Sequence, residues 1–194
     1  MSFSYYIIYK PYGYLSQFTK EVPTHQTLGD LYDFPSDVYP VGRLDKDSEG
    51  LLLLTNDKSL NHRLLDPKFA HRRTYWVQVE GVPQTHDIAQ LESGVTIRIN
   101  KRNHRTRPAQ AHIITSTLPD RNPPIRYRAN VPDTWLELQL TEGKNRQVRR
   151  MCAAVGFPVL RLVRQSIEGV KLGDMTVGEV RAIEREELLG LLGI

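Results

Sequence analysis

The chain has 194 residues, of which 40% are hydrophobic and 25% charged, and its formal net charge is +4. This composition is ordinary for a folded globular protein with one core or two small lobes. No apolar run approaches the ~20 residues of a membrane span, and the N-terminus lacks the pattern of a secretory signal, so we expect a cytoplasmic protein. The single cysteine, Cys152, excludes an internal disulfide, and the scattered histidines have no spacing typical of metal ligands, so we expect no metal.

The first half of the chain mixes strand and helix patterns without a regular alternation. Aromatic and β-branched runs, period-two alternation and turn residues mark the strands, and a capping residue followed by apolar positions marks the helices. In chain order we predict a strand at 5–9, a short helix at 27–32, a buried strand at 51–55, a helix capped by Asn56 or Asp57 that runs to about Leu65, and a strand at 74–80.

The second half continues in the same way. We predict a helix at 85–92, strands at 95–99 and 109–115 with a basic polar turn at 100–108 between them, a proline-rich loop at 118–132, a strand at 135–140, a helix capped by Asn145, a strand at 159–163 and a helix at 184–192. The order of elements favours an α+β fold with a mixed, mostly antiparallel sheet flanked by helices. We expect a single domain over residues 1–194, and the proline-rich loop is the best candidate for a boundary between two lobes.

Basic residues are concentrated in two segments. Residues 98–128 contain eight Arg or Lys against one acid, and residues 142–164 contain six against one, whereas residues 174–187 contain five acids and two arginines. A solvated basic face is the simplest explanation. Arginine pairs well with phosphate, however, so this distribution favours a nucleic acid as partner.

Three acids lie within five residues in the sequence GRLDKDSEG, residues 42–50. Acids repel phosphate, so a surface that only binds RNA gains little from them. One interpretation is a polar turn whose side chains bond their own backbone. The other is a carboxylate, Asp45, held on a rigid loop for catalysis. Spacing alone does not decide between the two.

The segment EGKNRQVRRM, residues 142–151, places Val148 and Met151 on the inner face of a helix and Arg149 beside that face. The helix could simply touch phosphate. Alternatively, an arginine at the core boundary could pair with a carboxylate, and a positive neighbour favours the charged form of an acid. Tyr75, on the strand at 74–80, is ordinarily a core residue, but it could also stack on a flipped base.

Four segments together resemble the family of pseudouridine synthases that modify bacterial ribosomal RNA. They are YKPYG at 9–13, GRLDKDSEGLLLLTND at 42–57, RTYWVQVEG at 73–81 and EGKNRQVRRM at 142–151 with RLVR at 161–164. Tyr9 replaces the usual asparagine of the first motif, and Arg73 replaces a lysine of the third. The resemblance implies the catalytic fold of that family, with no RNA-binding S4 domain ahead of it.

The resemblance also implies the roles of particular residues. Asp45 would be the catalytic aspartate, Arg149 would pair with it, and Tyr75 would contact the target base. Candidate contacts to RNA phosphate or to the base pocket are Arg43, Lys10, Arg146 and Leu162, although plain core packing also suits Leu162. The implied reaction converts a uridine of ribosomal RNA, and of 23S rRNA in particular, to pseudouridine without a cofactor or metal, and we expect a monomer.

Two other functions remain open at this point. A non-catalytic RNA-binding or ribosome-assembly protein would explain the arginines but not the acidic GRLDKDSEG loop. A glycoside hydrolase would use Asp45 and Asp47 as its acid pair, but that chemistry needs two carboxyls about 5–9.5 Å apart across a sugar. Alternate positions on one loop do not suit that geometry, and the basic segments would have no role.

Overall fold

The computed structural model describes residues 3–126, 128 and 130–194, and the chain divides into two compact units. One unit combines the chain up to His71 with residues 164–194, and the other is formed by residues 72–163. The chain therefore passes between the units twice, the second time within strand β11 (Val159–Ile167). The proline-rich loop at 118–132 lies inside the second unit and not at a boundary.

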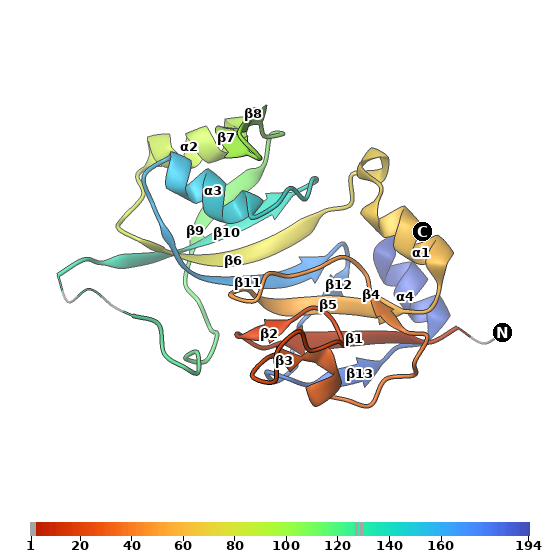
Figure 1. The fold of residues 1–194 in the computed structure, drawn as a ribbon. Coiled ribbons are helices and arrows are strands. Elements are labelled where there is room, and N and C mark those ends of the chain that lie inside the picture. The colour runs from red at the N-terminus through yellow and green to blue at the C-terminus, as the bar shows by residue number, and fades with distance from the viewer. Residues whose placement is uncertain (1–2, 127, 129) are drawn as a thin grey trace. The chain divides into compact units, whose positions relative to one another are not determined.

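The first unit is built on antiparallel strands. Strand β1 (Tyr5–Lys10) lies between β5 (Glu49–Thr55) and β13 (Val180–Ala182), as Figure 1 shows. The remaining elements of this unit are short: β2 (Tyr14–Leu15), β3 (Gln26–Thr27), a 3₁₀ turn at Leu28–Asp30, β4 (Tyr39–Pro40), α1 (Lys58–Leu65), a 3₁₀ turn at Pro67–Phe69, β12 (Val170–Lys171) and α4 (Arg185–Leu192).

Strand β5 has no polar alternation because every one of its residues is buried. Leu52 and Leu54 belong to a core cluster with Ile8 of β1 and Leu28. Helix α1 follows directly, and its start was predicted correctly. The Asp57 carboxylate accepts hydrogen bonds from the N–H groups of residues 59 and 60 at 3.0 and 3.1 Å, which satisfies donors that have no partner within the helix.

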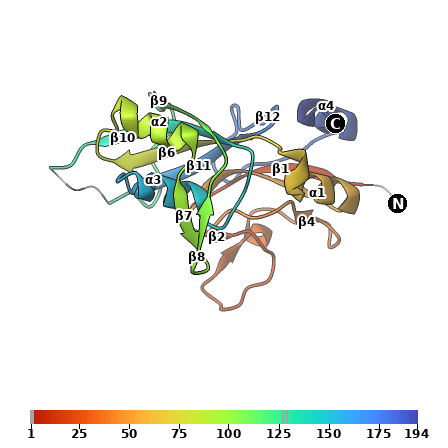
Figure 2. The same cartoon turned by 90° about the horizontal axis from the view of Figure 1, so that it is seen from above.

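The second unit pairs β10 (Asp133–Leu140) with β6 (Arg73–Glu80) on one side and β9 (Gln110–Ile114) on the other, all antiparallel. Helices α2 (Thr85–Ser93) and α3 (Gln147–Ala154) lie over one face of these strands (Figures 1 and 2). Their apolar side chains form one core with the inward leucines of β10, and this core includes Leu91, Leu136, Leu138, Leu140, Val148 and Met151.

A two-stranded hairpin stands apart from those strands. Strands β7 (Thr96–Ile99) and β8 (Arg102–Arg105) pair only with each other, and Ile99 lies opposite Arg102. The two residues of the turn, Asn100 and Lys101, both have positive φ, which is the geometry of a type I′ turn and matches the strand twist. We predicted a basic polar turn over the whole of 100–108, and this was wrong for residues 102–105, which form strand β8.

Two other expectations differ from the structure. The short helix predicted at 27–32 is only a 3₁₀ turn at Leu28–Asp30. Helix α3 begins at Gln147 with Arg146, not Asn145, as its N-cap residue. The two-residue strands β2, β3, β4 and β12 were not predicted, because so short a run has no measurable periodicity.

The fold class is confirmed, because helices accompany a sheet that is mostly antiparallel. The antiparallel pairings are those of β1 with β5 and β13, β10 with β6 and β9, β4 with β5, β11 with β12 and β7 with β8, and the small pair of β2 with β3 is parallel. Among the residues that the structure describes, no helix has the length and apolar character needed to cross a membrane.

Candidate active site

The loop that bears Asp45 is anchored on both sides of the aspartate. The Ser16 hydroxyl accepts a hydrogen bond from the Leu44 N–H at 3.0 Å and donates one to the Leu44 carbonyl at 2.8 Å. On the other side, the Lys46 carbonyl accepts from the Gly13 N–H at 2.8 Å. The Leu44 side chain is buried in the core, while Asp45 is only half-buried. The loop therefore presents a carboxylate from a restrained backbone, as precise catalysis requires.

The glycines that flank this loop are required by close packing. Gly50 has φ +111°, and a Cβ at this position would lie 2.4 Å from the Arg164 carbonyl oxygen. Gly42 has φ +71°, and its Cβ would lie 3.0 Å from a methyl group of Leu65 in α1. Both positions combine a left-handed backbone with a close neighbour, so only glycine fits without strain. The two glycines of the GRLDKDSEG sequence thus have a structural explanation that is separate from its acids.

Lys10, which we predicted to contact RNA phosphate or the base pocket, is completely buried, and that contact stays a prediction. Its Nζ donates to the carbonyls of Pro11 and Tyr14 at 2.9 and 2.6 Å. Burial lowers the pKa of Lys10 to about 8, against the opposing effect of nearby Glu49, Asp47 and Asp45. A lysine with this pKa is still mostly protonated at neutral pH, so it places a positive charge close to three acids of the loop. Its position suits support of the loop, whereas Arg43 is exposed and accessible to a ligand.

The segment EGKNRQVRRM, residues 142–151, is called the arginine segment below, and its backbone is unusual just before helix α3. Arg146 has φ 50° and ψ 34°, the left-handed region, which costs an L-residue about 1–2 kcal/mol. Its side chain is exposed. Asn145, predicted as the helix cap, instead accepts a hydrogen bond from an Arg150 nitrogen at 3.0 Å through its side-chain oxygen. Left-handed backbone at non-glycine residues is concentrated at functional sites, where the surrounding structure maintains it.

Arg149 is half-buried on α3, and one guanidinium nitrogen lies 3.5 Å from the Val159 carbonyl oxygen. Its charge lies near the buried thiol of Cys152, whose pKa is raised to about 12 by burial, with Arg149 acting in the opposite direction. This thiol is therefore un-ionised and unreactive at neutral pH. Arg149 thus lies at the core boundary of the second unit, as the helical pattern predicted.

Tyr75 and Leu162 differ in accessibility. Tyr75 lies on β6 opposite Leu138 and is half-buried, with its ring packed against the core of the second unit. Leu162 is 6% exposed and belongs to that core. Tyr75 therefore has a free portion that a ligand could meet, whereas core packing accounts for Leu162.

The predicted site residues are divided between the two units. The first unit contains Asp45, Arg43 and Lys10, and the second contains Tyr75, Arg146, Arg149 and Leu162. The pairing of Asp45 with Arg149 would link the units and stays a prediction. Sequence reasoning did not single out Ser16, which lies 28 residues along the chain from Leu44, the residue whose backbone it holds.

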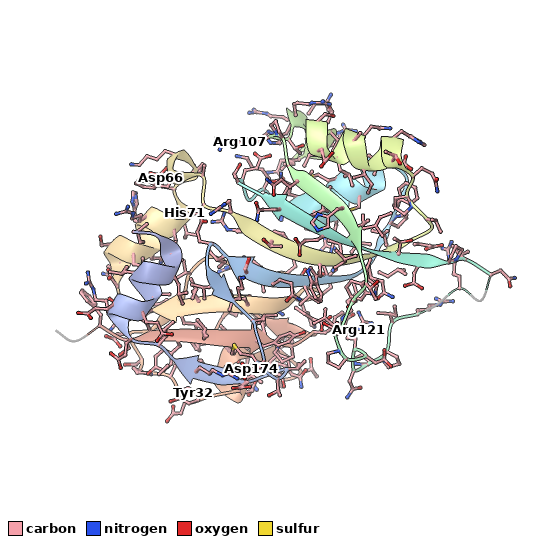
Figure 3. All side chains as sticks on the ribbon, turned by 180° about the vertical axis from the view of Figure 1, so that it is seen from behind. Tyr32, Asp66, His71, Arg107, Arg121 and Asp174 are labelled. Carbon is pink, nitrogen blue, oxygen red and sulfur yellow. The ribbon has the colours of Figure 1, made fainter. Side chains whose placement is uncertain are left out.

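The arginines of the 98–128 segment have different roles. Those of the hairpin and its exit, Arg98, Arg102, Arg105 and Arg107, are exposed. In the proline-rich loop, Arg121 (Figure 3) instead donates to the carbonyls of Pro123 and Pro124 at 2.8 and 3.1 Å, and Arg128 forms an exposed ion pair with Glu80. The hairpin and its exit therefore carry most of the exposed arginines of this segment.

Comparisons with known proteins agree with this arrangement. Residues 4–154 match the family model described as RNA pseudouridylate synthase. The chain is 53% identical over 164 residues to ribosomal large subunit pseudouridine synthase E of Xanthomonas axonopodis pv. citri, covering 83% of this chain and 84% of that protein. It is 49% identical to the protein of the same name from Vibrio parahaemolyticus, covering 92% and 73%. A crystal structure of a pseudouridylate synthase superposes with a TM-score of 0.80 at 28% identity, covering 98% and 74%.

Proposed function

Because this chain belongs to the RNA pseudouridylate synthase family, we propose that it converts a specific uridine of large-subunit ribosomal RNA to pseudouridine, with Asp45 as the catalytic carboxylate. The observation that supports Asp45 most directly is its half-buried position on a loop fixed through Leu44 and Lys46. A nucleophile or base held in one geometry reacts without first losing conformational freedom.

The reaction is an isomerisation, so its atoms balance within the substrate. The bond between N1 of the base and C1′ of the ribose breaks, the base turns, and a bond forms between C5 and C1′. The hydrogen on C5 leaves and N1 gains one. An ionised Asp45 next to the sugar and base could attack C1′, add to the base or remove a sugar proton, and all three roles require the same placement of its carboxylate.

The other site residues prepare the substrate and the carboxylate. The target uridine must leave its stack, at a cost of a few kcal/mol. Stacking on the half-exposed Tyr75 would recover about 1–3 kcal/mol of that cost. Arg149 would align Asp45 by an ion pair, and Arg43 and Arg146, both exposed, would contact phosphate.

The substrate is proposed from the relatives and from the charge distribution. Two relatives that align over most of this chain are named as large ribosomal subunit enzymes, which favours 23S rRNA. The exposed arginines of the β7–β8 hairpin provide a surface of the sign that RNA requires. A ribosomal substrate in turn implies action in the cytoplasm.

The test is release of tritium from 23S rRNA fragments labelled at uridine C5, because C5 cannot become the glycosidic carbon without losing its hydrogen. Asp45→Asn keeps the shape and removes the charge, so tritium release should cease while RNA binding persists. Asp47→Asn is the matched control, since it makes the same change two residues away on the same loop. Release by a pure Asp45→Asn protein would refute the assignment.

Arg149→Ala tests the proposed ion pair separately. It should slow release strongly, since Asp45 would lose its partner. Activity equal to that of the parent protein would show that the two residues do not act together. Release that depends on both Asp47 and Asp45 would instead favour a two-carboxylate mechanism.

A further inference from the structure

A buried carboxylate in the second unit has no role in the proposed reaction and yet has several partners. Glu142 is 6% exposed. Its Oε1 accepts hydrogen bonds from the Arg107 backbone N–H at 2.9 Å and from the Gln147 side-chain amide at 2.7 Å, and its Oε2 lies 3.2 Å from Nε2 of His104. Arg107, labelled in Figure 3, lies in the segment between β8 and β9. Glu142 thus connects the hairpin, the segment between β8 and β9, and the turn that precedes α3.

Gln147 passes this connection on to the turn before α3. The side-chain oxygen of Gln147 accepts a hydrogen bond from the Lys144 backbone N–H at 2.9 Å, and the backbone N–H of Gln147 donates to the Lys144 carbonyl at 3.1 Å. The turn of residues 144–147 is therefore closed by one backbone hydrogen bond and by the Gln147 side chain, and Glu142 holds that side chain. Arg146, inside this turn, is the residue with left-handed backbone.

A second set of contacts fixes the same turn from the helix side. The Arg150 guanidinium donates to the Arg98 carbonyl of β7 and to the Asn145 side chain. Arg150 therefore joins α3, the turn and the hairpin, while the Arg149 guanidinium lies against the Val159 carbonyl. The arginines of this motif have separate tasks, and at least one of them is structural.

We propose that Glu142 is a positioning residue. It sets the conformation of the turn at 144–147 and thereby the directions in which the side chains of Arg146 and Arg149 point. This inference rests on the proposed function, because the two arginines matter only if they act on RNA and on Asp45. Glu142 itself touches neither substrate nor Asp45 in this scheme.

The nature of the group supports a positioning role over plain packing. Burial would raise the pKa of Glu142, yet the hydrogen bonds from the Arg107 N–H, Gln147 and His104 together lower it below the ordinary value. Glu142 is therefore ionised at neutral pH. A buried ion serves stability no better than a well-packed apolar side chain does, and its advantage is the direction of its hydrogen bonds. The hydrogen bond with Gln147 leads to a turn that contains the left-handed Arg146, and such a strained backbone persists only where surrounding contacts hold it.

The experiment compares Glu142→Ala and Glu142→Gln, with Glu137→Ala as the matched control. Glu137 is a carboxylate of the same unit that accepts from the Trp76 indole at 2.8 Å and lies 3.5 Å from a nitrogen of His112, and both of these partners lie outside residues 142–151. The readouts are kcat and KM for tritium release from 23S rRNA fragments, and hydrogen exchange at the Lys144 and Arg107 amides.

Glu142→Ala should lower kcat by about 10- to 100-fold, because Arg149 is displaced and no longer aligns Asp45. The change in KM should be smaller, because most of the protein surface that binds RNA is unchanged. Exchange at both amides should become faster. Glu142→Gln retains an oxygen that can accept both hydrogen bonds, so it should recover most of the lost rate. Glu137→Ala should leave kcat and both amides unchanged.

Several results would overturn the proposal. One is a kcat for Glu142→Ala within twofold of that of the parent protein. Another is unchanged exchange at the Lys144 and Arg107 amides in Glu142→Ala. A third is a kcat for Glu142→Gln as low as that of Glu142→Ala. If Glu142→Ala does not fold, Gln147→Ala removes only the link to the turn and should give the same loss of kcat. A parent protein that releases no tritium refutes the proposed function instead, and amide exchange still tests whether Glu142 holds the turn.

Discussion

The anchoring of the Asp45 loop by Ser16 gives a prediction that involves no catalytic residue. Ser16→Ala removes a buried hydroxyl that satisfies both the N–H and the carbonyl of Leu44, at 3.0 and 2.8 Å. A buried polar group left without a partner costs about 1–3 kcal/mol. Two such groups in a loop that water can partly reach should cost about 2–3 kcal/mol, or roughly 4–12 °C in Tm for a chain of this size.

The same change should also reduce tritium release by about 10- to 100-fold, since the residue next to Asp45 loses both of its restraints. Urea unfolding measures the stability and the tritium assay measures the rate. Ser93→Ala is the control, because its hydroxyl donates to the Gln90 carbonyl at 3.1 Å on the exposed side of α2. Full activity and unchanged stability of Ser16→Ala would show that the loop is held by other contacts, and the argument from a fixed carboxylate would fail.

Two further predictions concern charge and backbone strain. Because burial lowers the pKa of Lys10 from 10.5 to about 8, the folded protein binds fewer protons than the unfolded chain between these values, and this contribution to stability should rise with pH through that window. Lys10→Met should lack that part of the rise, measured as the difference between urea-unfolding free energies at about pH 8 and about pH 10; equal pH dependence in both proteins would contradict the burial argument. Arg146→Gly should leave the free energy of unfolding unchanged or raise it by up to ~1 kcal/mol, since glycine adopts positive φ without strain. RNA binding should weaken, and the slope of log K against log salt concentration should fall in magnitude by about one, because one phosphate contact is lost. Thermal unfolding and binding at several salt concentrations check this, and a less stable Arg146→Gly protein with unchanged RNA affinity would refute it.

Elements with a strong local signal were predictable from the sequence. Strand β5 has four consecutive leucines between turn residues, and α1 starts at an aspartate whose side chain caps it. In both cases the residues that carry the signal lie within a few positions of one another along the chain. The same holds for the inward face of β10, where Leu136, Leu138 and Leu140 alternate with polar residues and enter the core.

Elements defined by distant partners were not predictable. Strand β8 consists of Arg-Asn-His-Arg, which has no apolar alternation because it pairs only with β7 and most of its residues are exposed. The start of α3 was misplaced by one residue for a related reason. The Asn145 side chain would make a good cap, but Arg150 takes its oxygen, and the turn is closed by Gln147 instead.

The candidate site shows the same division more sharply. Asp45, the proposed catalytic residue, and Arg149, its proposed partner, lie in motifs that the sequence displays. Some of the residues that hold those motifs in place lie far away along the chain: Ser16 is 28 residues from Leu44, and His104 is 38 residues from Glu142. A serine or histidine in such a place has no distinguishing sequence pattern, because its role comes from the tertiary contact alone. It follows that a chain could keep every motif and still be inactive if these supports were replaced, since the motifs supply the reactive groups and the supports supply their geometry.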